Sequence, residues 1–260
     1  MAARYRNETP QNTSRKGIIG LVCVLLFCIA AYFGIRFLWD LAQARSSKPS
    51  TELQRAALTS EDSAKASAYD WGGYELSDHE VVTTLLLTVD DVNAEAGQLQ
   101  AVQLLVLDLT ERSATLVNLP AGMWTRGDDG ASIAADALYA SSGAATTAGS
   151  RVTARVAAAL HLPFDHVFVM NAGVWEKFYQ LACKNGPLVT EAGALLSELK
   201  CDMNANSLLD FAAQAHDCGI SALATADAAY EDWTDHAGTT YPWVLPGPLS
   251  EQLHVRSYVG

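Results

Sequence analysis

Two adjacent acidic residues, Asp90 and Asp91, directly follow a short apolar run, residues 81–89 (VVTTLLLTV). A run of this length and composition is typical of a buried central strand. Open α/β sheets bind ligands beyond the carboxyl ends of such strands, and carboxylates are ligands for divalent metal ions. We therefore consider Asp90 and Asp91 a candidate weak metal site. The alternative is a carboxylate pair that only caps the loop.

Three arginines are candidate partners for an anionic ligand. Arg151 and Arg155 lie four residues apart in a segment with helical periodicity, residues 149–160, and so share one helix face. Arg126 lies in a glycine-rich segment that predicts a loop. Guanidinium groups match phosphate oxygens in geometry and charge, so these arginines are candidate ligand-binding residues. Asp91, which follows the same strand as Asp90, is a further candidate ligand-binding residue. The alternative for the helical pair is a solvated face.

No stand-alone catalytic signature accompanies these residues. The sequence lacks G-x-S-x-G, H-E-x-x-H, C-x-x-C and a glycine-rich phosphate loop. Its six histidines show no metal-ligand spacing. Of the cysteines after residue 50, Cys183, Cys201 and Cys218, at most one pair can form a disulfide, and the sequence does not say which.

Composition excludes several classes of protein. The chain has 260 residues, of which 50% are hydrophobic, and its formal net charge is −12. A hydrophobic fraction of one half is too high for an intrinsically disordered chain. The acidity argues against nucleic acid as a partner, because phosphate backbones are bound by Lys and Arg.

The charge is unevenly distributed around one long apolar run. Residues 1–50 hold seven bases against two acids, a net +5, and residues 51–260 hold ten bases against 27 acids, a net −17. Between the first bases and the acidic remainder, residues 18–35 carry no charge. We expect a cytoplasmic tail over 1–17 and a transmembrane helix over 18–39, with the N-terminus inside and the rest outside the cytoplasmic membrane. The alternative is a signal peptide cleaved near residues 42–44.

The exported part divides into a stalk and a folded domain. Residues 40–80 are rich in Ser, Ala and charge, which predicts a stalk containing at most a short helix near residues 51–58. From residue 81 to 260, strands alternate with helices, which indicates an α/β domain with a mixed central sheet flanked by helices. The expected strands are 81–89, 102–109, 114–119 and 167–171; the expected helices are 132–141, 149–160, 173–183, 188–199 and 208–215, with a mostly irregular proline-containing end.

The order of these segments resembles the LytR-CpsA-Psr (LCP) family of bacterial cell-envelope proteins. The likeness runs from Thr83 to Cys183. It rests on LLLTVD at 85–90, a strand–turn–strand unit closing on Pro120, the helix 149–160, LPFDHVFVMN at 162–171 and WEKF at 175–178. The resemblance implies an extracytoplasmic phosphotransferase that uses Mg²⁺ to move a glycopolymer from a polyprenyl pyrophosphate carrier onto peptidoglycan.

The uncharged segments of that family match this sequence better than the family's charged motif residues do. Asp90 matches the aspartate after the first strand, and the resemblance therefore makes Asp90 the candidate catalytic residue. The Arg-x-Asp that opens the second strand falls on Gln98 and Gln100, and the Pro-Arg-Asp after the third reads Pro120-Ala121-Gly122. The family's Lys-x-Asn falls on Ser132 and Ala134, and its later arginine pair is missing. Mg²⁺ is therefore expected to bind weakly or not at all.

Three functions remain open on the sequence. The first is a membrane-anchored, catalytically degenerate LCP protein, a pseudoenzyme, that binds cell-wall proteins or a polyprenyl-linked glycan. The second is an active, divergent phosphotransferase that recruits charges such as Asp91, Arg126 or Arg151. The third is a structural envelope protein whose similarity ends at the fold.

Overall fold

The computed structural model describes residue 26 and residues 29–39, 41–42, 48–69, 78–127 and 129–253. The chain separates into two compact units, residues 1–43 and 44–260. In the first unit residues 29–39 are helical, and most of their large apolar side chains are exposed. In the part of the chain described, we find no helix with the length and apolarity needed to cross a membrane. Residues 18–25, 27 and 28 of the predicted span, residues 18–39, fall outside the described residues, so the span stays a prediction.

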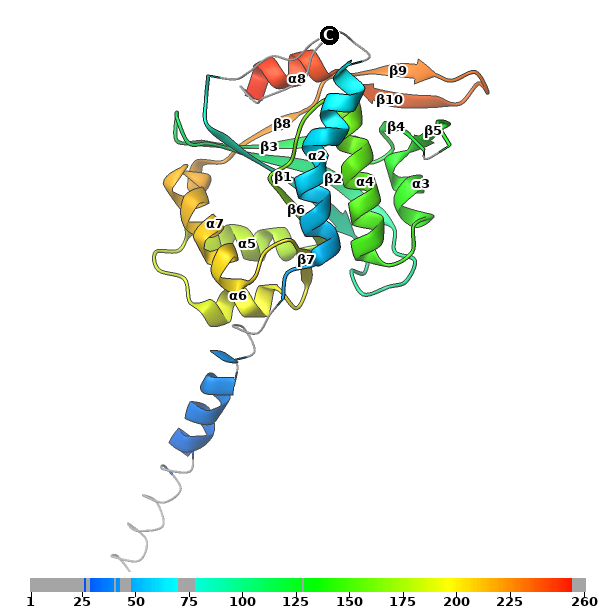
Figure 1. The fold of residues 1–260 in the computed structure, drawn as a ribbon. Coiled ribbons are helices and arrows are strands. Elements are labelled where there is room, and N and C mark those ends of the chain that lie inside the picture. Colours follow the sequence, from blue (N-terminus) through cyan, green and yellow to red (C-terminus); the bar gives the residue numbers. More distant parts are fainter. Residues whose placement is uncertain are drawn as a thin grey trace, which may run out of the picture. The chain divides into compact units, whose positions relative to one another are not determined.

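The second unit is built on a six-stranded mixed sheet in the order β7-β6-β1-β2-β3-β8 (Figure 1). Its central strand β1 is antiparallel to β2 and parallel to β6. The strands are β1 (Val81–Val89), β2 (Leu99–Asp108), β3 (Ser113–Leu119), β6 (His166–Asn171), β7 (Leu199–Cys201) and β8 (Ala224–Asp227). The four strands expected from the sequence therefore share one sheet, and the predicted mixed α/β fold is confirmed for this unit.

Alternation along the central strand explains why both faces of the sheet are covered. Leu85 and Leu87 belong to one buried cluster, whereas Leu86 between them belongs to another. Successive side chains of a strand point to opposite faces, so an uninterrupted apolar run requires a layer of helices on each side.

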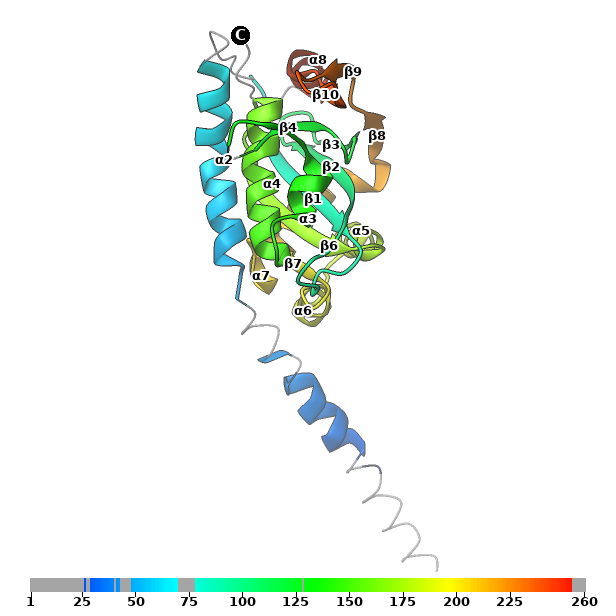
Figure 2. The ribbon, with the colours of Figure 1, turned by 90° about the vertical axis from the view of Figure 1, so that its right-hand side faces the viewer.

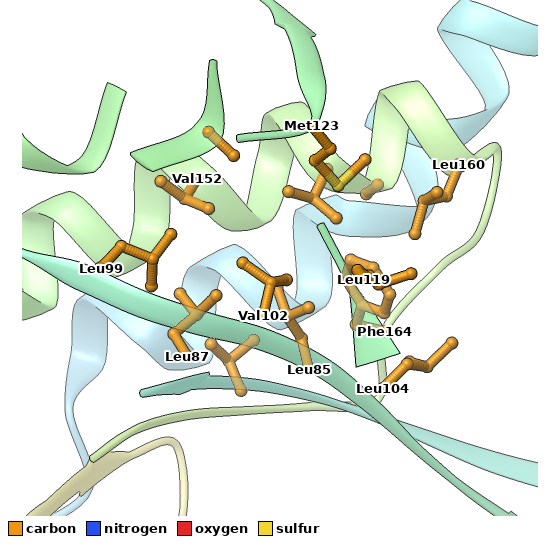
Figure 3. Packing of buried hydrophobic residues seen from close by; sticks show 14 of the residues in the cluster. Leu85, Leu87, Leu99, Val102, Leu104, Leu119, Met123, Val152, Leu160 and Phe164 are labelled. Atoms are coloured by element: carbon orange, nitrogen blue, oxygen red, sulfur yellow. The ribbon is translucent and has the colours of Figure 1, made fainter. Parts of the chain in front are cut away.

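The two helical layers differ in make-up. One face is covered by α2 (Thr51–Tyr69), α3 (Ala135–Ala140) and α4 (Ala145–Leu160). Figure 3 shows Leu87, Val102 and Val152 gathered between the sheet and these helices. The other face is covered by α5 (Val174–Cys183), α6 (Val189–Leu195), α7 (Ala205–Asp217) and the short η1 (Ile220–Ala222). Figure 2 shows α5, α6 and α7 in the lower part of the domain.

Helix α2 corrects the predicted stalk. Leu53 is fully buried in the core, and the Ser60 hydroxyl donates to the carbonyl of Phe164 at 3.1 Å. The backbone N–H of Phe164 in turn donates to that hydroxyl at 2.8 Å. The stalk prediction is thus wrong for residues 51–69. The hydrophobic periodicity of α2 is weak in the sequence, because its buried stripe consists of Leu53, alanines and Ser60, whose hydroxyl is hydrogen-bonded.

Helix α4 begins earlier than its polar residues suggest. The sequence predicts a helix over residues 149–160, but the helix begins at Ala145 and its N-cap is Ala144. Gly149 lies inside the helix, where a Cβ atom would approach Val169 Cγ2 to 2.6 Å. This glycine lets α4 pack closely on β6, so the apparent helix breaker is a packing residue.

The C-terminal stretch is more regular than expected. It forms the hairpin β9 (Tyr230–Thr234) and β10 (Thr240–Val244), followed by α8 (Pro246–Leu253). A second small hairpin is formed by β4 (Trp124–Arg126), in the segment predicted as a loop, and β5 (Ser132–Ala134), on the first residues of the predicted helix 132–141. The prolines are compatible with these elements because Pro242 lies in a two-stranded sheet and Pro246 opens a helix.

Candidate functional site

Asp90 lies at the edge of the sheet where three strands meet. Val89 ends β1, pairing with Leu99 of β2 on one side and Asn171 of β6 on the other. The β1–β2 register shifts between Thr88 and Val89, a β-bulge. Such bulges are common beside functional sites because they redirect side chains. The predicted position of Asp90, beyond the carboxyl end of the central strand, is confirmed.

The carboxylate of Asp90 closes its own loop. Its Oδ1 accepts the backbone N–H of Gln98 at 2.7 Å and that of Asp91 at 2.9 Å. The Asp90 backbone N–H donates to the Gln98 carbonyl at 3.2 Å. The N–H groups of Gln98 and then Asp91 lower the pKa of Asp90, because they stabilise the charged form. This is the geometry of a loop-capping carboxylate.

Asp91 is engaged in the same loop. Its Oδ1 accepts the backbone N–H of Asn93 at 2.9 Å, and Asn171 Oδ1 accepts that of Val92 at 2.6 Å. Both aspartates are exposed. Within the described ranges no group of three or more His, Cys, Asp or Glu side chains is placed to hold a metal. Two exposed carboxylates already bonded to the backbone are a poor match for Mg²⁺, so the metal site stays a prediction.

Tyr139 of α3 is the unexpected member of this edge. It is buried and its hydroxyl has no hydrogen-bond partner among the described residues. A Cβ atom at Gly97 would lie 3.1 Å from Asp90 Oδ1 and 3.7 Å from Tyr139 Cε1. Burial and then the nearby Asp90 charge raise the pKa of Tyr139 to about 12. Sequence reasoning missed this residue because it is one aromatic in an alanine-rich helix.

The predicted arginines lie on two other elements. Arg151 Nη1 donates to Ser142 Oγ at 2.8 Å, and the half-buried Arg155 follows one turn later on α4. Arg126 is exposed at the end of β4, two residues after Trp124, whose ring lies 5.5 Å from that of Trp233. The five candidate side chains are thus spread over the loop after β1, the β4 strand and the α4 helix.

The positions where the resemblance expects charges lie at the same edge as Asp90. Gln98 and Gln100 are exposed at the start of β2, beside the bulge. Since Val102 pairs with Leu119 in the antiparallel β2–β3 ladder, Ala121 lies close to the register position of Gln100. The Ala121 carbonyl accepts the backbone N–H of Asp136 at 3.1 Å. Three positions where the resemblance expects charges therefore carry neutral side chains at this edge.

The described cysteines form no disulfide. Cys183, Cys201 and Cys218 are all free thiols. Burial raises the pKa of Cys201 to about 12 and also raises that of Cys218, so both side chains behave as small apolar residues.

Comparison with known proteins returns structures only. No family profile and no curated protein matches the chain. Protein gbs0355 from Streptococcus agalactiae is similar with a TM-score of 0.48 and 12% identity, covering 68% of this chain and 89% of that one. TagT bound to LI-WTA has a TM-score of 0.46 and 14% identity, with 68% and 92% covered. B. subtilis TagT has a TM-score of 0.44 and 15% identity, with 66% and 88% covered.

TagT is an LCP enzyme. Structures from the family named on sequence grounds are thus among those to which this chain is similar. The similarity assigns no role to any residue here.

Proposed function

We propose that this chain is a membrane-anchored, extracytoplasmic cell-envelope protein of the LCP type that acts by binding and does not catalyse phosphotransfer. One observation carries the proposal. Gln98, Gln100 and Ala121 lie at the edge where the resemblance expects charged residues, and the Asp90 carboxylate there is bonded to its own loop.

The acidic residues near this edge would repel a pyrophosphate, which is also negatively charged. The ionisable residues near the edge include Asp90, Asp91 and Glu95 of the β1–β2 loop and Asp136 of α3. Phosphoryl transfer requires positive groups that stabilise charge on the transferred oxygens. Removing one such preorganised group typically costs about 10²–10³ in rate. An edge that is neutral to acidic favours a binding role.

The anchoring belongs to the same proposal. The +5 charge of residues 1–50 and the −17 charge of residues 51–260 favour a single-pass protein with the N-terminus in the cytoplasm. Residues 29–39 are helical and present large apolar side chains to their surroundings. The partners we propose are cell-wall proteins or a polyprenyl-linked glycan, with Mg²⁺ dispensable.

The catalytic half of the proposal is tested with the full chain in detergent micelles. We expect no Mg²⁺-dependent release of phosphate or glycan from a polyprenyl pyrophosphate substrate, and no difference between the unmodified chain and Asp90→Asn. Robust turnover that Asp90→Asn abolishes would contradict the proposal and identify an active, divergent phosphotransferase.

The binding half needs its own measurement. The full chain purified from bacterial membranes should carry polyprenyl-linked glycan, detectable by mass spectrometry of the extracted lipid, or should crosslink to cell-wall proteins in intact cells. A matched single-pass protein carrying only residues 1–50 is the control. If neither the glycan nor a crosslinked cell-wall protein is found above the level of that control, the binding proposal is contradicted and a purely structural protein remains.

A further inference from the structure

A cavity of about 480 Å³ lies beside the first turn of α2. Lys48, Ser50 and Thr51 form one wall, Thr146 of α4 another, and Lys200 of β7 a third. The backbone N–H of Ser50 donates to the Cys201 carbonyl at 2.8 Å, which holds the start of α2 against β7.

The lysines of this cavity differ from the other lysines of the domain. Lys65, Lys177 and Lys184 each form an ion pair with a glutamate. Lys48 and Lys200 form no ion pair with any residue that the structure describes. The chain has a net charge of −12, and the two described lysines that lack a carboxylate partner line the same cavity.

We infer that this cavity binds a phosphate-class oxyanion. Two ammonium groups supply charge and up to three donors each, and the hydroxyls of Ser50, Thr51 and Thr146 supply neutral donors. The inference does not rest on the proposed envelope function, because it concerns other residues.

The backbone around the cavity agrees with this assignment. α4 has 16 residues and begins at Ala145. The first backbone N–H groups of a helix have no intrahelical acceptor. No side chain caps α4, so the N-cap residue supplies no side-chain acceptor for them either. The 19-residue α2 begins at the same cavity. Thr147 Oγ1 donates to Glu52 Oε2 at 3.2 Å, which brings the two helix starts side by side (Figure 2). Glu52 is the one acidic residue of the lining, and this hydrogen bond ties it to α4.

The cavity is separate from the Asp90 edge. β7 pairs with β6, which pairs with β1, so two strand spacings of about 4.8 Å lie between β7 and the end of β1. Leu199 and Met203 add an apolar wall. This wall suits a phosphate ester, which a soluble metabolite or the head group of an anionic lipid could supply.

The experiment compares the full chain with Lys48→Gln, Lys200→Gln and the double variant. Lys184→Gln is the matched control, because it removes the same charge from an exposed, ion-paired site. Inorganic pyrophosphate is the soluble probe, measured by calorimetry in neutral detergent. Hydrogen exchange is followed at residues 48–54 and 145–148. A second arm uses nanodiscs of phosphatidylcholine with or without phosphatidic acid.

We expect ligand-dependent protection of both segments, a loss of affinity of about tenfold for each lysine removed, and weakening by salt. Protection by pyrophosphate identifies a soluble oxyanion, and protection only in phosphatidic acid nanodiscs identifies a lipid head group. No protection in either arm would overturn the inference. So would a double variant that binds as tightly as Lys184→Gln while both melt at the same temperature.

Discussion

The Asp90 carboxylate accepts the backbone N–H of Gln98 at 2.7 Å and so links the end of β1 to the start of β2. A residue that the sequence presents as a candidate catalyst is therefore part of the loop's own framework. The link makes Asp90 a determinant of stability, and the consequence is measurable.

Asp90→Asn should weaken the pH dependence of stability in acid. The folded-state pKa of Asp90 is lowered by the N–H groups of Gln98 and Asp91. Its stabilisation is thus present above the unfolded pKa of about 3.9 and is lost as pH falls through the folded pKa. Urea unfolding between neutral and acid pH should show a shallower slope for Asp90→Asn. Glu95→Gln, in the same loop, is the control, and an equal change in slope would contradict the assignment.

Restoring the missing charges should create activity if the edge keeps the geometry of an LCP site. The variant Gln98→Arg/Gln100→Asp/Ala121→Arg places three charges around Asp90. We expect Mg²⁺-dependent hydrolysis of a polyprenyl pyrophosphate above the background of the unmodified chain, by roughly 10², although such effects do not add simply. Adding Asp90→Asn should remove the gain. A triple variant without turnover would mean that more than charge has been lost.

Gly149→Ala should destabilise the domain. The new Cβ would lie 2.6 Å from Val169 Cγ2 and 3.1 Å from Leu53 Cδ2. Overpacking of this kind typically costs about 1–3 kcal/mol, which lowers the melting temperature by several degrees. Gly122→Ala is the matched control, because its Cβ would meet its nearest atom only at 3.9 Å. Equal melting temperatures for the two variants would be inconsistent with this packing.

The pair formed by His79 and Asp108 should make stability fall as the pH rises above the ordinary histidine pKa of about 6.5. His79 Nδ1 lies 2.6 Å from Asp108 Oδ2, and this hydrogen bond is the main reason why the pKa of His79 is raised. The stabilisation is complete below the unfolded pKa of about 6.5 and is lost as pH rises through the folded pKa. His79→Gln should abolish this loss in urea unfolding, with His236→Gln, an exposed histidine, as the control. NMR titration showing an ordinary pKa for His79 would refute it.

The orientation of the chain can be tested by fusion after Gly260. A reporter active only in the cytoplasm should be silent there, because four basic residues, Arg4, Arg6, Arg15 and Lys16, precede the apolar run. The same reporter fused before Met1 should be active. Cytoplasmic activity of the C-terminal fusion would reverse the proposed topology.

The sequence by itself determined four of the six strands of the main sheet. Residues 81–89, 102–109, 114–119 and 167–171 could be recognised because hydrophobic periodicity is a local signal that burial on both faces strengthens. The end of β1 was predictable for the same reason, and with it the position of Asp90. The neutral residues Gln98, Gln100 and Ala121, at positions where the resemblance expects charges, were also visible in the sequence alone.

Only the tertiary structure decided which polar residues belong together. Helix α2 reads as a stalk because its buried stripe is small and polar, and only its contacts with Phe164 and α4 place it in the core. Likewise, Lys48 and Lys200 are far apart in sequence, and no periodicity links them. They line one cavity because Ser50 bonds to Cys201 across the edge of the sheet. Long-range hydrogen bonds and cavity walls depend on how the chain folds back on itself, a property that local residue patterns do not encode.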